Sequence, residues 1–424
     1  MEREIADLER RNTWTMIPRS DVPSGEPVAP GRWVYVEKDR PQDPNADPDA
    51  AKRGWTLRQV DIVMAYLHGR LGKTIYMRQP TGFEVGTPHA MVCAVGGSLY
   101  GLDPAAKIWY DFLTALLREN GFKPSPYDPA LWRHTSRNHL YMTIYVDDLH
   151  IIAEDPADAD WLVDTLANKL EIKDLKEPSK YLGMEVERRP DGAIKLTLRR
   201  YIDRLVQDFR LDDAVPVPTP ILEGLKIDDT PVCRTRRRVH QKAIPTRSPK
   251  NEIDEFPNAS YLPIGYTDSD WAGPLNGERK STSGFIFKLA GAPISWRSSK
   301  QPCVSLSSNE AEYVALSEAV REATWLRNMM MELGFVTAKD PLPIRADNKG
   351  SIDLATVAAI TARSKHIDTR FHYSRTQLNE GVISIKHVPT EDMVADGLTK
   401  PLSTVAFRHF IDLLGLFTGN SEND

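Results

Sequence analysis

The spacing of hydrophobic residues changes several times along the chain, and each spacing predicts a different kind of element. Residues 140–146 and 149–153 are apolar and rich in β-branched and aromatic side chains, and they flank the adjacent carboxylates Asp147 and Asp148. Two such runs around a short polar step predict a β-hairpin. Residues 59–62 are also strand-like, carry Asp61 and lead into an amphipathic segment. From residue 55 to residue 153 we therefore expect a strand, a helix, a loop, a second helix and the hairpin.

Helical spacing is clearest over residues 106–121, where apolar residues recur every three or four positions until Gly121 ends the pattern. Residues 157–170 and 201–209 show the same amphipathic spacing. Between these two helices, residues 181–187 and 194–198 alternate as two strands joined by a Pro-Asp-Gly turn at 190–192. The apolar stripe of the first helix consists of Trp109, Phe112, Leu113, Leu116 and Leu117.

From residue 262 the pattern changes to short antiparallel strands, predicted at residues 264–271, 284–289 and 293–297. Ser307 and Glu310 form a capping box that opens a helix ending near Gly334. A strand at 343–347, a helix at 350–356, a strand at 382–388, a helix from Glu391 to Lys400 and a tail helix at 403–416 complete the pattern. This predicted order matches the element order of the ribonuclease H fold, which is three strands, a helix, a strand, a helix, a strand and a helix.

Composition limits the class of protein. The chain has 424 residues, 41% hydrophobic and 27% charged, which is typical of a soluble protein with two or three domains. It lacks an apolar run of 18 residues and begins without a signal peptide, so we expect neither a membrane span nor secretion. Three scattered cysteines fit reduced thiols in an intracellular protein of the cytoplasm or nucleus. The net charge of -5 means that any binding of nucleic-acid phosphates depends on local basic patches.

The carboxylates at the hairpin suggest metal chemistry. An Asp-Asp pair between strands more often simply makes the turn, but here Asp61 on a neighbouring strand adds a third carboxylate. Unpaired carboxylates among apolar residues are costly to bury, and a hard cation such as Mg²⁺ offsets that cost. Three carboxylates on adjacent strands could hold two metal ions about 4 Å apart, the arrangement used in phosphoryl transfer.

Several motifs then resemble one family. Tyr-Val-Asp-Asp at 145–148 resembles the polymerase signature of reverse transcriptases. The segments at 75–80, 82–83, 98–102 and 109–110 resemble the copia-type long-terminal-repeat retrotransposon polyprotein, and the likeness runs in family order from about residue 12 to about residue 416. The resemblance implies a right-hand polymerase palm in which Asp61, Asp147 and Asp148 bind the catalytic metal ions.

Two departures from the family bear on polymerase activity. The basic fingers strands that grip the incoming nucleotide are missing between about residue 40 and residue 55, where residues 41–49 form a Pro- and Asp-rich loop pattern. After the Gly-Leu of 101–102, Asp103 and Pro104 replace the family's basic residue and its glutamine. A carboxylate repels a triphosphate, and proline lacks the hydrogen-bonding side chain of glutamine. DNA synthesis is therefore expected to be impaired.

The C-terminal half resembles the copia-type ribonuclease H at 266–273, 279–284, 307–313, 346–348, 365–372 and 388–401. The resemblance implies hydrolysis of the RNA strand of RNA·DNA hybrids, with Mg²⁺, or Mn²⁺ in its place, as cofactor. Each carboxylate alone could equally be a capping or surface residue. Asp270 is expected to be structural, and the helix start with His366, Asp368, Arg370 and His372 is expected to contact hybrid backbone or core. The four metal-binding carboxylates implied by the match are Asp268, Glu312, Asp347 and Asp396.

The expected fold class is α+β and α/β, multidomain, with a partial polymerase palm followed by a ribonuclease H-like mixed sheet with helices. We expect a truncated fingers segment and loop at 1–54, a palm and thumb-proximal region at 55–225, a basic linker at 226–258, a ribonuclease H-like domain at 259–416 and a disordered tail at 417–424. The linker replaces the family's helical connection. It either binds nucleic-acid phosphates or is a solvated disordered linker or a targeting-like basic run.

The sequence is compatible with two functions. One is a reverse transcriptase and ribonuclease H fragment whose partners are an RNA template, an RNA·DNA hybrid and, if the polymerase works, deoxynucleoside triphosphates. The other is a non-catalytic, decayed or domesticated nucleic-acid-binding relic that keeps the carboxylates.

Overall fold

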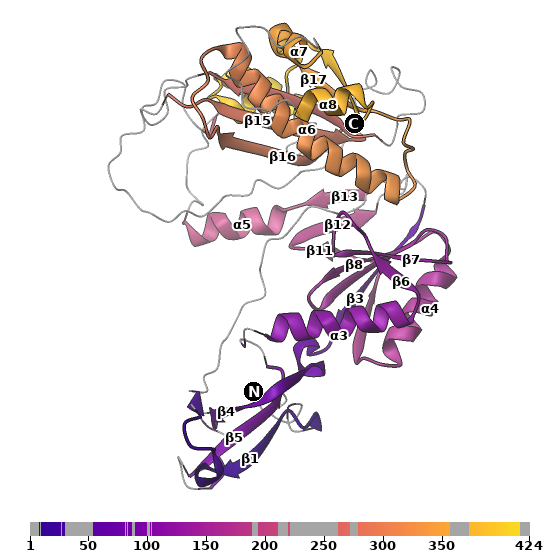
Figure 1. Cartoon of the computed structure of the whole chain (residues 1–424), viewed down its shortest axis with the longest axis vertical. Helices are drawn as coiled ribbons and strands as arrows, with labels where there is room; N and C mark the ends of the chain where they lie inside the picture. Colours follow the sequence, from indigo (N-terminus) through magenta and orange to yellow (C-terminus); the bar gives the residue numbers. More distant parts are fainter. Residues whose placement is uncertain are drawn as a thin grey trace. The chain divides into compact units, whose positions relative to one another are not determined.

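The computed structural model of the chain (Figure 1) describes residues 8, 10–26, 28–29, 54–80, 82, 84–86, 90–99, 102, 104–188, 194–210, 219–220, 262–271, 279–356 and 373–415. The chain divides into two compact units, one formed by the described residues up to Pro178 and the other by those from Ser179 onward. Each unit has its own sheets and helices, so the chain is a multidomain protein of mixed α and β structure, as predicted.

The first unit begins with a four-stranded sheet in the order β1-β5-β4-β2. The sequence predicted a helix and a loop after Asp61, and this was wrong, because only the short 3-10 helix η2 (Ala65–His68) precedes two further strands. Met64 before η2 has φ +54°, a left-handed conformation that does not continue a right-handed helix. The strands of this sheet are β1 (Trp14–Pro18), β2 (Val28–Ala29), β4 (Arg70–Arg78) and β5 (Met91–Gly97).

The second sheet of this unit contains the predicted hairpin, formed by β8 and β9. Six antiparallel strands follow the order β10-β3-β9-β8-β7-β6. The hairpin turn lies at Val146 and Asp147, where Val146 takes φ +53°. The strands are β3 (Thr56–Ile62), β6 (Phe122–Pro124), β7 (Leu131–His134), β8 (Leu140–Tyr145), β9 (Asp148–Ala153) and β10 (Ile172–Lys176).

Helices α3 (Ala105–Glu119) and α4 (Pro156–Ala167) supply the other half of this core. Four residues of the predicted α3 stripe are buried, whereas Phe112 is 39% exposed. Trp109 also donates its indole N–H to the Val146 carbonyl at 2.6 Å, so the core helix is tied to the hairpin turn. The core joins α3 and α4 to alternate residues of β3, β8 and β9, such as Val60, Met142 and Leu149.

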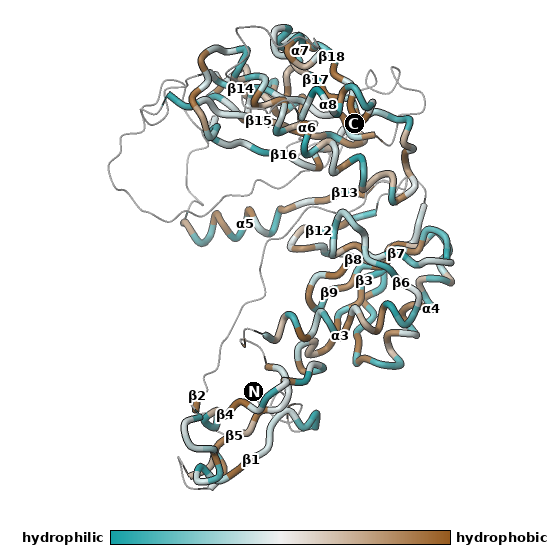
Figure 2. Tube along the Cα trace, in the orientation of Figure 1, coloured by the Kyte–Doolittle hydropathy of each residue, from teal (hydrophilic) through white to brown (hydrophobic). Residues whose placement is uncertain are grey.

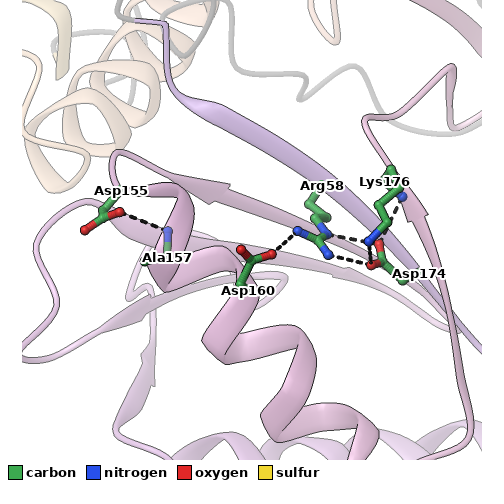
Figure 3. A network of polar contacts seen from close by, with 6 residues as sticks. All are labelled: Arg58, Asp155, Ala157, Asp160, Asp174 and Lys176. Atoms are coloured by element: carbon green, nitrogen blue, oxygen red, sulfur yellow. Dashed lines mark hydrogen bonds and ion pairs between the residues drawn. The ribbon is translucent and has the colours of Figure 1, made fainter.

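Arg58 links three elements of the first unit (Figure 3). From β3 it binds Asp174 of β10 through two hydrogen bonds, Nε to Oδ1 at 3.0 Å and Nη2 to Oδ2 at 2.5 Å, and it also pairs with Asp160 of α4. Lys176 Nζ adds a 2.7 Å bond to the same Asp174 carboxylate. The hydrogen bond from Arg58 holds the pKa of the Asp174 carboxyl well below its usual range. The edge strand β10 is therefore fastened to β3 by charge as well as by backbone pairing.

Replacing Arg58 by methionine is expected to lower the free energy of unfolding of the first unit by about 1–2 kcal/mol at pH 7, since it leaves a partly buried carboxylate short of donors. The Asp174 carboxyl has a depressed pKa, so its charged form stabilises the fold at pH values above the ordinary pKa of 3.8. That stabilisation is lost as the pH falls through the depressed pKa. The deficit should therefore shrink only as the pH falls well below 3.8, towards the depressed pKa. Urea unfolding at pH 7 and pH 2 measures it, with the exposed Lys107 of the Asp111 pair changed to methionine as control. An equal deficit at both pH values would contradict the role of Asp174.

The second unit starts with a small antiparallel sheet, β11-β12-β13, and helix α5 (Arg199–Asp208). The single strand predicted at 181–187 is in fact two strands, because Leu182 and Gly183 both take positive φ and turn the chain. In Figure 2 the tube of α5 alternates between hydrophilic and hydrophobic colours, as in an amphipathic helix. The strands are β11 (Lys180–Tyr181), β12 (Met184–Arg188) and β13 (Ile194–Thr197).

The main sheet of the second unit has five strands in the order β16-β15-β14-β17-β18. The first three are antiparallel, whereas β17 runs parallel to both β14 and β18. This confirms the predicted antiparallel strands and the predicted order of the five strands along the chain; the order of strands within the sheet was not predicted. The turn between β15 and β16 is made by Ala290 and Gly291, both with positive φ. The strands are β14 (Ile264–Asp270), β15 (Thr282–Leu289), β16 (Ala292–Lys300), β17 (Leu342–Ala346) and β18 (Ile383–His387).

Helix α6 (Ser308–Glu332) packs against β14, β15 and β17. Ser307 caps it as predicted by accepting the Glu310 N–H at 3.2 Å, and Glu310 accepts the Leu306 N–H at 2.7 Å. In place of the single helix predicted from 391 to 400, the structure has two short helices with residues 393–395 between them. The side chains of Met393 and Val394 pack into a hydrophobic core with the C-terminal helix α10 (Thr404–Leu414). The remaining helices are α7 (Lys349–Thr356), α8 (Tyr373–Asn379), η4 (Thr390–Asp392), α9 (Asp396–Thr399) and α10 (Thr404–Leu414).

Several predicted features lie outside the described residues. They are the loop at 41–49, Asp103, the turn at 190–192, the basic segment at 226–258, the helix start at 366–372 and the tail at 417–424. Among the helices that the structure describes, none combines the length and hydrophobicity needed to cross a bilayer.

Candidate active sites

Three carboxylates of the second unit meet at one edge of its main sheet. Asp268 lies on β14, and Asp347 follows β17 directly. Because β14 and β17 are parallel neighbours, their carboxyl ends reach the same edge. Asp396 is the first residue of α9, which packs against β14 and β15. One oxygen of each carboxylate lies within 4.8 Å of the others, and among the described residues this is the one group with such a geometry.

Glu312, in the first turns of α6, is not among the three residues whose oxygens lie within 4.8 Å of one another, but it interacts electrostatically with two of them. Its side chain is buried, and burial raises the pKa of its carboxyl, with the charges of Asp268 and Asp347 adding to the rise. Asp268 is 3% exposed, and burial followed by the charge of Asp396 raises its pKa as well. All four residues predicted from the sequence are therefore electrostatically linked. Asp268 and Glu312 are buried, whereas Asp347 and Asp396 are half-buried. Acidic groups that repel one another in such a place form a site that a cation would stabilise.

Side chains from neighbouring elements donate hydrogen bonds to the carboxylates of the cluster. Thr390 Oγ1 donates to Asp347 Oδ2 at 2.9 Å, and Thr399 Oγ1 donates to Asp268 Oδ2. The ammonium of Lys400 lies 2.9 Å from Asp396 Oδ2. The other oxygen, Asp396 Oδ1, is buried and has no hydrogen-bond partner within the described parts of the chain. Oxygen donors with an open lone pair are the ligands that hard divalent cations prefer, so the residues fit such an ion.

The sequence reasoning missed Thr399 and Lys400 as parts of the site. Both lie in the motif at 388–401, three and four residues after Asp396, where a helical turn brings side chains back to the same face. Burial acts to lower the pKa of Lys400, but its hydrogen bond with Asp396 and the nearby carboxylates outweigh burial and raise it. That spacing was the signal that could have identified them. Asp270, expected to be structural, ends β14 and is not in the group of three.

Divalent ions are expected to raise the Tm of the chain, and the shift should grow with pH. Carboxyls whose pKa is raised stabilise the fold below their ordinary pKa, and this stability is lost as pH rises through the raised value. The metal-free Tm should thus fall between pH 5.5 and 8.5. Ten millimolar Mg²⁺ should restore about 1–3 kcal/mol at pH 8.5 and less at pH 5.5, where protons compete. Thermal unfolding with Mg²⁺ or EDTA tests this, and a shift that is larger at pH 5.5 would contradict it.

The carboxylates of the first unit are arranged differently. Asp61 on β3 lies directly opposite Asp148 on β9, so these two side chains share one face of the sheet. Asp147 occupies the hairpin turn, where its carbonyl accepts the Ile62 N–H at 2.8 Å. These three residues do not form a group with ligand atoms within 4.8 Å of one another, since among the described residues only the cluster of the second unit does.

Basic and amide groups approach the same carboxylates. Lys173 on β10 is the cross-strand partner of Asp61, and its Nζ lies 3.0 Å from Asp61 Oδ2. Gln59 Nε2 donates to Asp148 Oδ1 at 3.1 Å. The row Lys173, Asp61 and Asp148 therefore crosses three adjacent strands with one positive and two negative charges. Lys173 was not recognised from the sequence, because cross-strand register is not visible there.

The chain is similar in sequence to known proteins over most of its length. The family model described as "Reverse transcriptase (RNA-dependent DNA polymerase)" matches residues 49–223. The retrovirus-related Pol polyprotein from transposon TNT 1-94 of Nicotiana tabacum is 31% identical over 502 aligned positions, covering 98% of this chain and 37% of the relative. The corresponding polyprotein from transposon RE1 of Arabidopsis thaliana is 33% identical over 410 positions, covering 87% of this chain and 28% of the relative.

The chain thus spans about a third of the length of these curated relatives. The first alignment has more positions than the chain has residues, so that relative contains stretches that are missing here. A solved structure of the foamy viral protease-reverse transcriptase in complex with RNA/DNA hybrid is 10% identical with a TM-score of 0.42, and the match covers 100% of this chain and 55% of that one. From the family match and the two transposon relatives, the chain belongs to the copia-type retrotransposon Pol polyproteins.

Proposed function

We propose that the second unit hydrolyses the RNA strand of RNA·DNA hybrids, using Mg²⁺, or Mn²⁺ in its place, held by Asp268, Glu312, Asp347 and Asp396. The observation that carries the proposal is the meeting of three carboxylates within 4.8 Å at the edge of a ribonuclease H-like sheet. Divalent ions bound there would supply an activated water and stabilise the leaving 3′ oxygen.

The residues of this chain contribute orientation and charge. Thr399 and Thr390 fix the rotamers of Asp268 and Asp347 through their hydroxyl donors. Burial of Asp268 and Glu312 excludes water from their carboxylates, which strengthens their interaction with a bound cation. The open Asp396 Oδ1 offers a further ligand. The four carboxylates thus form a preorganised site rather than a solvated acidic surface.

DNA synthesis by the first unit is the second candidate activity, with Asp61, Asp147 and Asp148 as metal ligands, an RNA or DNA template and deoxynucleoside triphosphates as substrates. Its support is the family match over residues 49–223 and the shared face of Asp61 and Asp148. The Lys173 ion pair at Asp61 and the replacement of the family's glutamine by Pro104 argue for weak synthesis. The alternative is a non-catalytic relic that binds nucleic acid without reacting.

The test is Mg²⁺-dependent cleavage of a labelled RNA·DNA hybrid by the full chain, with the Asp347→Asn variant as control. Cleavage of the RNA strand alone, lost with EDTA and in the variant, is the expected result. A matching DNA duplex should stay intact. A folded wild-type chain that binds the hybrid but leaves the RNA whole would overturn the nuclease proposal and favour the relic. Primer extension on the same preparation tests the polymerase separately.

A further inference from the structure

Lys400 is a positive group built into the carboxylate cluster. Its Nζ lies 2.9 Å from Asp396 Oδ2, and its side chain is 39% exposed, so much of it is packed in the protein. Three acidic side chains, Asp268, Asp347 and Asp396, have oxygens within 4.8 Å of one another. An ammonium in contact with one of them is therefore close to the shared negative charge of all three.

A merely structural role does not account well for this lysine. Cations near a helix C-terminus interact favourably with the helix dipole, but α9 has only four residues and therefore little dipole. The partner of Lys400 is also Asp396, one of the proposed metal ligands, rather than an exposed surface carboxylate. Moreover, the two carboxylate oxygens of Asp396 have different surroundings. Oδ2 is paired with Lys400, whereas Oδ1 is buried and has no hydrogen-bond partner within the described residues. The charge on Oδ2 is therefore balanced by Lys400, whereas Oδ1 keeps a lone pair that could bind a cation.

We propose that Lys400 is a positioning residue that acts as the internal counter-ion of the cluster, holding Asp396 in place and opposing the binding of a divalent ion. The inference rests on the proposed function, because it concerns the ion that the cluster would bind. A dication and an ammonium at the same carboxylate repel each other, and the repulsion is strong where burial lowers the effective dielectric constant. Lys400 thereby sets the Mg²⁺ concentration at which the site fills.

Thr399, the residue before Lys400, reinforces this reading. Its single hydroxyl hydrogen is shared between two acceptors, Asp268 Oδ2 and the Asp396 carbonyl oxygen, which lies 3.1 Å from Oγ1. Two consecutive residues therefore hold two different carboxylates of one cluster, a neutral donor on Asp268 and a charge on Asp396. Without Lys400, Asp268 would still be held by Thr399, but Asp396 would lose both the group that holds it and the charge that balances it.

The test is a Mg²⁺ titration of Tm with the full-length wild type and the Lys400→Met, Lys400→Arg and Lys339→Met variants. Lys400→Met should lower the Mg²⁺ concentration at half-maximal shift about tenfold, and its Tm in EDTA should fall. Lys400→Arg keeps the charge and should resemble the wild type, as should Lys339→Met, which removes an exposed lysine. If Lys400→Met does not fold, Lys400→Gln takes its place. Calorimetric titration of Mg²⁺ provides the same midpoint without heating.

The outcomes separate the two proposals. An unchanged midpoint in Lys400→Met, with a wild type that binds Mg²⁺ and cleaves hybrid, overturns the counter-ion role alone. A midpoint in Lys400→Arg that matches Lys400→Met also overturns it, because packing rather than charge would then be responsible. A wild type that binds Mg²⁺ but does not cleave leaves the counter-ion result valid and removes the nuclease function. A folded wild type without any Mg²⁺ response overturns both.

Discussion

Replacing Asp268 by asparagine should lower hybrid cleavage by at least about 10²-fold while raising the Tm measured in EDTA at pH 8. Asp268 is 3% exposed and faces Asp396 and Glu312, so its charge is costly in the absence of a cation. Asparagine has the same shape and keeps an acceptor for the Thr399 hydroxyl. Removing one buried charge should therefore stabilise the metal-free fold by about 1–2 kcal/mol. The same change removes one of the four carboxylates that we propose as metal ligands for the cleavage reaction.

The two effects are measured on one preparation, cleavage with Mg²⁺ and thermal unfolding with EDTA. Asp353→Asn is the matched control, since it removes an exposed carboxylate of α7 and should change neither. A variant with lower activity and lower Tm would indicate that Asp268 supports the fold rather than the chemistry. Full activity in the variant would exclude Asp268 as a metal ligand.

The second large effect is expected from Gly284→Ala. Gly284 on β15 lies opposite Asp268, and a Cβ there would stand 2.7 Å from Thr399 Cγ2 and 3.0 Å from Leu398 Cβ. At such distances α9 has to move away from the sheet, and α9 carries Asp396. Overpacking of this kind costs about 1–3 kcal/mol, and a shift of a catalytic group by a fraction of an ångström can cost about tenfold or more in rate.

Cleavage by Gly284→Ala should therefore fall further than its loss of Tm explains, and the Mg²⁺ midpoint should rise. The control is Gly96→Ala on β5, where an added Cβ meets nothing within 4 Å. Activity measured well below the Tm of the variant separates a displaced site from an unfolded one. A variant with normal cleavage would mean that α9 adapts without moving Asp396.

The predictions that rested on local sequence patterns were the most accurate. The hairpin around Asp147 and Asp148 and the capped helix from Ser307 formed as predicted, because turn chemistry and capping depend on neighbours in the chain. The errors arose where a turn interrupts a regular pattern. Positive φ at Met64 replaced a predicted helix by strands, and at Leu182 it divided one strand into two.

The resemblance to the copia-type ribonuclease H pointed to Asp268, Glu312, Asp347 and Asp396 as the predicted metal ligands, since each lies at a fixed place in a matching motif. It could not show which of them come within reach of one ion. That depended on the parallel pairing of β14 with β17 and on α9 packing closely over Gly284. Both are contacts between residues far apart in the chain.

The sequence by itself thus indicated the family, the order of the main-sheet strands of the second unit along the chain and the acidic residues predicted as metal ligands. Only the tertiary structure revealed the two lysines, Lys173 on Asp61 and Lys400 on Asp396. The physical reason is that an ion pair depends on distance. Cross-strand register places Lys173, and the packing of α9 against the sheet places Lys400 beside three carboxylates.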